Sequence, residues 1–139
     1  MPIASHAAIA SAYPPTIHRA TPLAGVAIEG GGGVNAVGGE EGTSLHRADV
    51  AYGKAYGAVG LGMSSRKIME RADAQAYFIA AMSHITGGRL VPVPGGVLIR
   101  DAAGALLGAA GISGDTSDND EACCVAGIAA AGLVAETGA

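Results

Sequence analysis

The sequence predicts an α+β domain in which an antiparallel sheet of about five strands is flanked by helices. Short apolar runs bounded by glycine, proline or aspartate are typical of strands, and they alternate with longer alanine-rich segments of helical period. Half of the 139 residues are hydrophobic and 14% are charged, which is enough apolar material for a packed core. A chain of this length usually forms one domain. We therefore expect residues 1–139 to fold as a single unit, with residues 1–22 as a less regular N-terminal segment.

The expected strands are apolar runs that stop at turn residues. A four-glycine turn at Gly30–Gly33 predicts a hairpin between the first two of them. Pro92 and Pro94 place a later run at a sheet edge or bulge, because proline has no N–H to donate to a ladder. The expected strands are Leu23–Ile28, Val34–Val37, Arg89–Val93, Val97–Arg100 and Ala105–Ile112.

Three helices are expected in the first two thirds of the chain. Ser5–Tyr13 is long enough for two helical turns before Pro14 stops it. In Ser44–Met63, small residues recur every three or four positions and form one face suited to close packing. Ser64 or Ser65 caps a short helix that runs through Ala72. The small face consists of Ala48, Ala51, Ala55, Ala58 and Gly62.

Two further helices complete the pattern. Asp73 caps a helix from Ala74 to Ile85, which Gly87-Gly88 ends. Asp118, with Glu121 three residues later, has the capping-box spacing for a terminal helix that runs to about Val134. This last helix is apolar almost all round, so we expect it to be buried. The apolar stripe of the earlier helix is Phe78, Ile79, Met82 and Ile85.

Charge and targeting signals narrow the function classes. The formal net charge is −4, and the few cations are scattered, so nucleic-acid binding is not expected. No basic n-region precedes Arg19, and no apolar run approaches the ~20 residues that span a bilayer. We expect a cytoplasmic protein that does not bind membranes. The adjacent Cys123 and Cys124 point about 100° apart on a helix and are expected to be reduced, buried small hydrophobes.

The junction between the last expected strand and the terminal helix is the first candidate site. Four carboxylates fall within the seven residues that begin at Asp115. Ser113, Gly114 and Asp115 would present a hydroxyl and backbone amides at a helix N-terminus, where anions bind favourably. Three readings stay open here: helix capping with a subunit contact, a small-molecule site, and a metal site. The spacing of the acids does not match an EF-hand.

Two histidines and one lysine are the other candidates. His46 opens one expected helix and His84 closes another, so each is either a surface residue or, if haem binds, an axial ligand. Lys54 is either solvated or positioned to pair with Glu29, Asp49 or a ligand carboxylate. The sequence contains no convincing catalytic constellation, and it leaves open whether the protein is an enzyme.

Three segments together resemble the GlcG/HbpS-like family, which includes proteins of glycolate-utilisation loci, haem-binding proteins and the C-terminal domain of the PduO-type protein. The segments are HRADVAYGKAYGAVGLGMSSRKI from His46, GGRLVPVPGGVLIRDAAGALLGAAGISGD from Gly87, and TSDNDEACCVAGIAAAGL from Thr116. The motifs GMSSR and SGDTSDNDE most resemble those of the GlcG branch. The chain departs from the family's pattern in its short first helix and in Glu29, which stands where an aspartate is usual.

The resemblance implies a profilin-like sandwich that assembles into dimers or larger rings, and the alanine- and glycine-rich core also favours a homo-oligomer. It implies a protein that binds a small molecule or cofactor, with haem as the leading candidate, and that is accessory to a catabolic pathway. One alternative is an accessory enzyme acting on a small hydroxy-acid or aromatic carboxylate, with Lys54 binding the carboxylate and Asp115 moving a proton. A second alternative is a structural or partner-binding subunit. The candidate binding residues are His46, Lys54, His84, Gly95, Gly96, Ser113, Gly114 and Asp115.

Overall fold

The structure is a computed structural model that describes residues 22–138. Along the chain the strands are β1 (Ala24–Glu29), β2 (Val34–Gly39), β3 (Gly96–Arg100), β4 (Leu106–Ser113) and β5 (Val134–Glu136). The helices are α2 (Arg47–Leu61), α3 (Ser65–Ala74), α4 (Ala76–Ile85) and α5 (Ser117–Ala130). The helix predicted at Ser5–Tyr13 lies outside the described residues.

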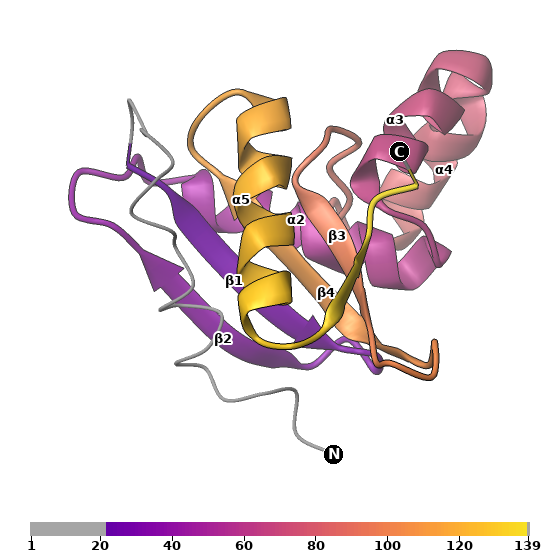
Figure 1. The fold of residues 1–139 in the computed structure, drawn as a ribbon. Helices are drawn as coiled ribbons and strands as arrows, with labels where there is room; N and C mark the ends of the chain where they lie inside the picture. The colour runs from indigo at the N-terminus through magenta and orange to yellow at the C-terminus, as the bar shows by residue number, and fades with distance from the viewer. Residues whose placement is uncertain (1–21, 139) are drawn as a thin grey trace.

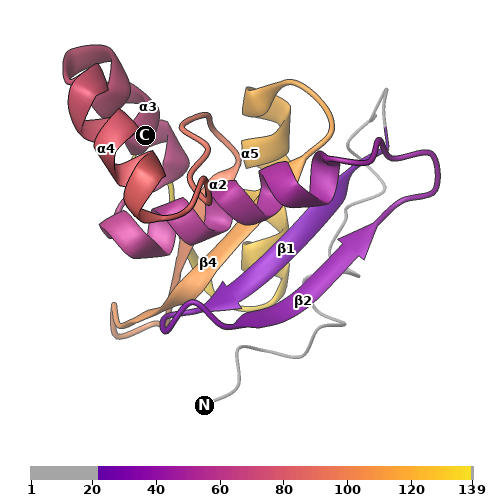
Figure 2. The same ribbon diagram turned by 180° about the vertical axis from the view of Figure 1, so that it is seen from behind.

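The five strands form one sheet in the order β2-β1-β4-β3-β5, and all neighbouring strands are antiparallel. Helix α5 covers one face of this sheet, and α2 covers the opposite face (Figure 1). Helices α3 and α4 form a pair beside the C-terminal end of α2, as Figure 2 shows from behind. The predicted α+β class and the five-stranded antiparallel sheet are confirmed.

One predicted strand is wrong, and a different segment takes its place in the sheet. Residues 89–93 form no strand but cross α2, where Val91 N donates to Gly53 O at 3.2 Å. The prolines at 92 and 94 remove two ladder donors, and Gly53 leaves room for the Val91 side chain, because a Cβ there would lie 2.6 Å from it. The fifth strand is instead β5, which pairs with β3. The terminal helix therefore ends at Ala130, short of the predicted Val134.

Of three predicted helix caps, one is confirmed and two are wrong. Ser64 caps α3 as predicted, and its hydroxyl accepts from Lys67 N. However, α3 continues through Asp73, so Asp73 caps nothing and α4 begins after Gln75. The capping box predicted for the terminal helix is also wrong. Thr116 caps α5, and its Oγ1 accepts from Asn119 N at 3.3 Å.

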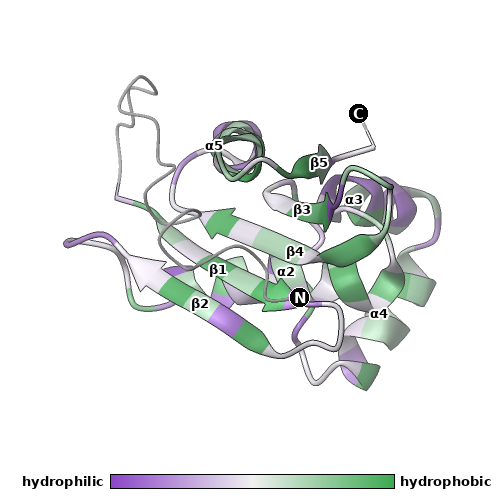
Figure 3. Cartoon of the chain, turned by 60° about the horizontal axis from the view of Figure 1, so that its bottom comes forward, coloured by the Kyte–Doolittle hydropathy of each residue, from purple (hydrophilic) through white to green (hydrophobic). Residues whose placement is uncertain are grey.

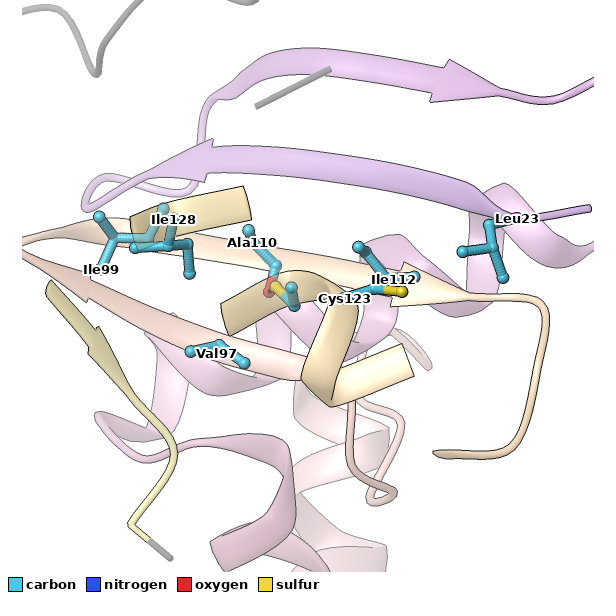
Figure 4. Close-up of a cluster of buried hydrophobic side chains, with 8 residues drawn as sticks. Leu23, Val97, Ile99, Ala110, Ile112, Cys123 and Ile128 are labelled. Atoms are coloured by element: carbon cyan, nitrogen blue, oxygen red, sulfur yellow. Dashed lines mark hydrogen bonds between the residues drawn. The ribbon is translucent and has the colours of Figure 1, made fainter. Parts of the chain in front are cut away.

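An apolar layer fills the space between the sheet and α5. Side chains of β3 and β4 point toward the inner face of α5 (Figure 4). Cys123 and Cys124 belong to this layer as buried cysteines that form no disulfide, which confirms their expected placement. The buried members are Leu23, Val97, Ile99, Ala110, Ile112, Cys123, Cys124 and Ile128.

The layer between the sheet and α2 is thin because its residues are small. Ala51, Ala55 and Ala58 are fully buried, which confirms the predicted small face at these positions. A Cβ at Gly111 of β4 would lie 2.1 Å from Ala51 O, so only glycine permits this approach of helix to sheet. The backbone of α2 therefore packs almost directly on the strands.

The two edges of the sheet differ. On the β2 edge, Val34 and Val37 lie opposite Ile28 and Val26, which pack against α2, yet they are 52% and 61% exposed. On the other edge, β5 has three residues, and the Oγ of Ser64, the N-cap of α3, donates to Thr137 O just beyond it. The short edge is thus tied to a helix, and the longer edge is apolar and exposed.

Candidate functional site

A buried ion pair joins the two helical layers past the end of the sheet. Lys54 Nζ of α2 donates to Ile112 O at 2.9 Å and to Asp120 Oδ2 of α5 at 3.1 Å. Both side chains are 2% exposed. Burial lowers the pKa of Lys54, and the Asp120 carboxylate opposes that shift. Asp120 Oδ1 also accepts from Asp115 N at 2.9 Å, so the strand-to-helix junction is fixed to the same carboxylate.

These contacts overturn the partners predicted for Lys54. The lysine pairs with neither Glu29 nor Asp49, and it is not solvated. Sequence reasoning did not separate Asp120 from the neighbouring carboxylates. The available signal was its spacing, because Cys123 and Cys124 lie three and four residues after Asp120 and so share a helical face with it.

Gly95 and Gly96, two of the predicted binding residues, pack against the Lys54–Asp120 ion pair. A Cβ at Gly95 would lie 2.7 Å from Ile112 O and 2.8 Å from Lys54 Nζ. A Cβ at Gly96 would lie 2.4 Å from Lys54 O, and Gly96 N donates to Ser65 Oγ at 2.7 Å. Protein atoms therefore occupy the space in which the glycines were expected to meet a ligand.

The rest of the predicted junction is also engaged within the protein. Ser113 is 1% exposed, and a Cβ at Gly114 would lie 2.4 Å from Pro22 O. The Asp115 carboxylate accepts from Thr116 N at 2.7 Å and from Asn119 Nδ2 at 3.1 Å. The structure thus brings Lys54 and the junction together around Asp120, and the geometry gives them a packing role. Their role in ligand binding stays a prediction.

The remaining carboxylates of the junction pair with one arginine of α3. Arg66 Nε lies 3.1 Å from both Glu121 oxygens, and the same guanidinium contacts Asp118. These contacts explain why Asp118 and Glu121 do not form the predicted capping box. Within residues 22–138, no group of three or more His, Cys, Asp or Glu side chains is arranged to hold a metal.

The two candidate histidines lie in different places. His46 Nδ1 lies 3.3 Å from Asp49 Oδ2, and both side chains are about four-fifths exposed. His84 is exposed in the last turn of α4. The start of α2 lies away from the α3–α4 pair in both ribbon views (Figures 1 and 2). The structure therefore does not bring the two imidazoles together.

Helix α4 is apolar on its outer face as well as on its inner face. Residues 74–88 contain no Asp, Glu, Lys or Arg, and α4 is coloured largely as hydrophobic beside a hydrophilic α3 (Figure 3). Phe78, Ile79 and Met82 pack inward as predicted, but Ile85 is 73% exposed and does not belong to that stripe. We call the outer residues the α4 patch: Ala76, Tyr77, Ala80, Ala81, His84 and Ile85, all exposed. An exposed apolar patch commonly marks a binding surface.

A cavity of about 170 Å³ lies beside the β1–β2 turn. The turn is a hairpin turn, as predicted, and Gly30 N donates to Leu107 O at 3.0 Å. Sequence reasoning did not anticipate that the turn would also form one wall of a cavity against the C-terminal half of α2. The lining residues are Gly30, Gly31, Gly32, Tyr56, Val59 and Gly60.

Fold and surface together define a class: an α+β sandwich that carries an uncharged exposed helix with one histidine in it. The chain belongs to the HbpS-like family, because the family model described as "Haem degrading protein HbpS-like" matches residues 7–129. The resemblance seen in the sequence is confirmed. A comparison with curated proteins found no match.

Solved structures show the same fold. A PduOC–haem complex superposes with a TM-score of 0.77 at 20% identity and covers 94% of each chain. The Klebsiella pneumoniae protein ORFY gives 0.79 at 17% identity, with 92% of this chain and 90% of that chain covered. HbpS gives 0.71 at 23% identity, with 91% and 83% covered. At these identities the likeness is one of fold. None of the helices described here is both long and apolar enough to span a bilayer.

Proposed function

We propose that this protein binds haem on the α4 patch, with His84 as an axial ligand. The observation that carries the proposal is an exposed helix face without formal charge that contains a single imidazole. A porphyrin is a flat apolar plate whose iron takes an axial ligand, often a histidine. The match to the HbpS-like family and the haem complex of PduOC support haem as the ligand class.

The residues of the α4 patch fit such a plate. A helical side chain leans toward the preceding turn, so we expect the His84 imidazole to lie on the side of Ala80 and Ala81. The methyl groups of these alanines leave room for a flat ligand, and Tyr77 and Ile85, each 73% exposed, flank it. Covering this patch would remove apolar surface from water at about 25 cal/mol per Å². When bound, the iron would supply a redox-active centre with a further coordination position.

His46 is the weaker candidate because its surroundings are polar. The one apolar residue directly beside it in the chain is the exposed Leu45, which precedes it. Arg47 follows it directly, Asp49 lies one helical turn further along the chain, and its Nδ1 is engaged by the Asp49 carboxylate. Such a contact orients an imidazole well, but charged groups offer no surface to the apolar face of a porphyrin. The two exposed histidines thus form a matched pair for a test.

The test is a haem titration of the wild type, His84→Ala and His46→Ala, followed by the Soret absorbance. We expect His84→Ala to weaken binding by roughly tenfold or more, about 1.4 kcal/mol, and His46→Ala to bind like the wild type. A second pair places a charge on an exposed helical alanine, Ala81→Glu on the α4 patch and Ala122→Glu on α5. Only Ala81→Glu should weaken binding. Wild-type binding by both His84→Ala and Ala81→Glu would contradict the proposal.

We further propose that the protein is a cytoplasmic homo-oligomer of the GlcG branch, accessory to a catabolic pathway. The exposed Val34 and Val37 of the β2 edge support assembly, because a second subunit would cover them. Light scattering after size exclusion would test this, since the monomer has a mass of 13.5 kDa. The alternative of a carboxylate-handling enzyme loses its main support, because Asp120 already binds Lys54 in the interior.

A further inference from the structure

We propose that the cavity beside the β1–β2 turn binds a single aromatic ring that carries a hydrogen-bond acceptor. This site is separate from the α4 patch and does not depend on haem binding. Its six lining residues include four glycines, and the other two are Tyr56 and Val59 of α2. Four of the six positions that line the cavity thus carry no side chain.

Packing does not explain the glycine at position 60. In the same helix, a Cβ at Gly53 would lie 2.6 Å from Val91 and a Cβ at Gly57 would lie 3.2 Å from Leu90, so both glycines admit the crossing segment. A Cβ at Gly60 meets nothing within 4 Å, and its backbone is helical. A helical glycine costs about 1 kcal/mol relative to alanine. Gly60 lines the cavity, and we attribute the glycine at this position to the open space beside it.

The size and walls of the cavity suit one ring. The cavity is open to solvent on one side, and its volume of about 170 Å³ is close to the ~150 Å³ of an enclosed, engineered apolar cavity that binds benzene. Tyr56 supplies an aromatic wall, against which a second ring can stack or meet edge to face. The Tyr56 ring is itself held in place, with the Tyr52 ring centroid at 5.5 Å and the Arg89 guanidinium 4.3 Å from its own centroid.

The turn offers a hydrogen bond to an acceptor on that ring. Gly30 N and Gly32 N are used within the protein, by Leu107 O and Glu29 O. The Gly31 amide donates to no acceptor in residues 22–138, and a Cβ there would meet nothing within 4 Å. The interactions of Tyr56 with Tyr52 and Arg89 involve its ring, and neither uses its hydroxyl. A ring with a carbonyl or carboxylate oxygen can therefore be held at its edge as well as across its face.

The test uses two probes of the same ring, benzamide and benzoate, added to the ¹⁵N-labelled full chain and followed by amide shifts. We expect at least one probe to shift the amide resonances of Gly31 and Gly60 through ring currents. The probe that binds more tightly shows whether the site prefers a neutral or an anionic acceptor. Gly60→Leu places a side chain in the cavity and should weaken binding by roughly tenfold or more. Ala122→Leu, at an exposed position of α5, should bind like the wild type.

Two results would overturn the proposal: no shift at the turn with either probe, or unchanged affinity in Gly60→Leu. A thermal melt checks that Gly60→Leu is folded, which we expect because leucine is a better helix former than glycine. His84→Ala should bind both probes normally, so a failure of haem binding and a failure of this site are distinguishable.

Discussion

Replacing Lys54 by methionine should lower the free energy of unfolding, because the substitution leaves the Asp120 carboxylate buried without its cation. Methionine keeps the length and apolar stem of lysine but removes the ammonium group. Asp120 would then retain the hydrogen bond from Asp115 N at 2.9 Å and lose the ion pair at 3.1 Å. The pair is closed to water, since both side chains are 2% exposed, so solvent cannot replace the lost partner.

The expected cost follows from that burial. Removing one partner of a buried ion pair typically costs about 3–5 kcal/mol, whereas exposed pairs contribute about 0–1 kcal/mol. A domain of this size is stable by about 5–15 kcal/mol, so the loss would be a large share of the total. Asp120→Asn removes the charge but keeps an oxygen for Asp115 N. Combined with Lys54→Met, it should recover about 1–3 kcal/mol relative to Lys54→Met alone.

The wild type, the two single variants and the double variant form a double-mutant cycle. Urea unfolding followed by far-ultraviolet circular dichroism measures the free energy of unfolding of each. The signature is a negative interaction energy between the two substitutions, with the double variant more stable than Lys54→Met. A cost below about 1 kcal/mol for Lys54→Met, as for an exposed pair, would refute the argument from burial. Simple additivity of the two single costs would refute the coupling.

Two further predictions follow from the same interior. Burial places the folded-state pKa of Lys54 below its unfolded value of about 10.4, so between the two values the unfolded chain binds more protons. The free energy of unfolding of the wild type should therefore rise relative to Lys54→Met as pH increases toward 10.4; a flat difference in urea titrations would contradict this. Burial also raises the pKa of the Cys124 thiol. At mildly alkaline pH, both cysteines should react with a thiol reagent only after unfolding in urea, and rapid reaction of the native protein would count against their burial.

The fold was largely predictable because its strands and helices are punctuated by glycine and polar caps. The hairpin at Gly30–Gly33, the cap at Ser64 and the small face of α2 needed only local patterns. The errors arose where tertiary contacts override local pattern. The segment 89–93 has the composition of a strand but packs on α2, and the three-residue β5 is too short to give a periodic signal.

The candidate site was predictable in part. The sequence placed a cluster of polar groups at the strand-to-helix junction, but not the pairing of Lys54 with Asp120, which are 66 residues apart in the chain. Local spacing cannot identify a partner at that separation. His84 was a candidate from its type alone, and only the structure shows that its neighbours on α4 are exposed rather than packed.

The unequal edges of the sheet restrict how it can grow. At β5 a further strand would have only three residues to pair with, and the chain beyond it is held by Ser64. At β2 six residues of extended backbone form the outer edge of the sheet within the described part of the chain. Exposed edges of this kind are templates for strand addition. Any extension of the sheet, by a second copy or by a foreign peptide, is therefore directed to β2, and an added charge at Val37 would be the simplest way to block it.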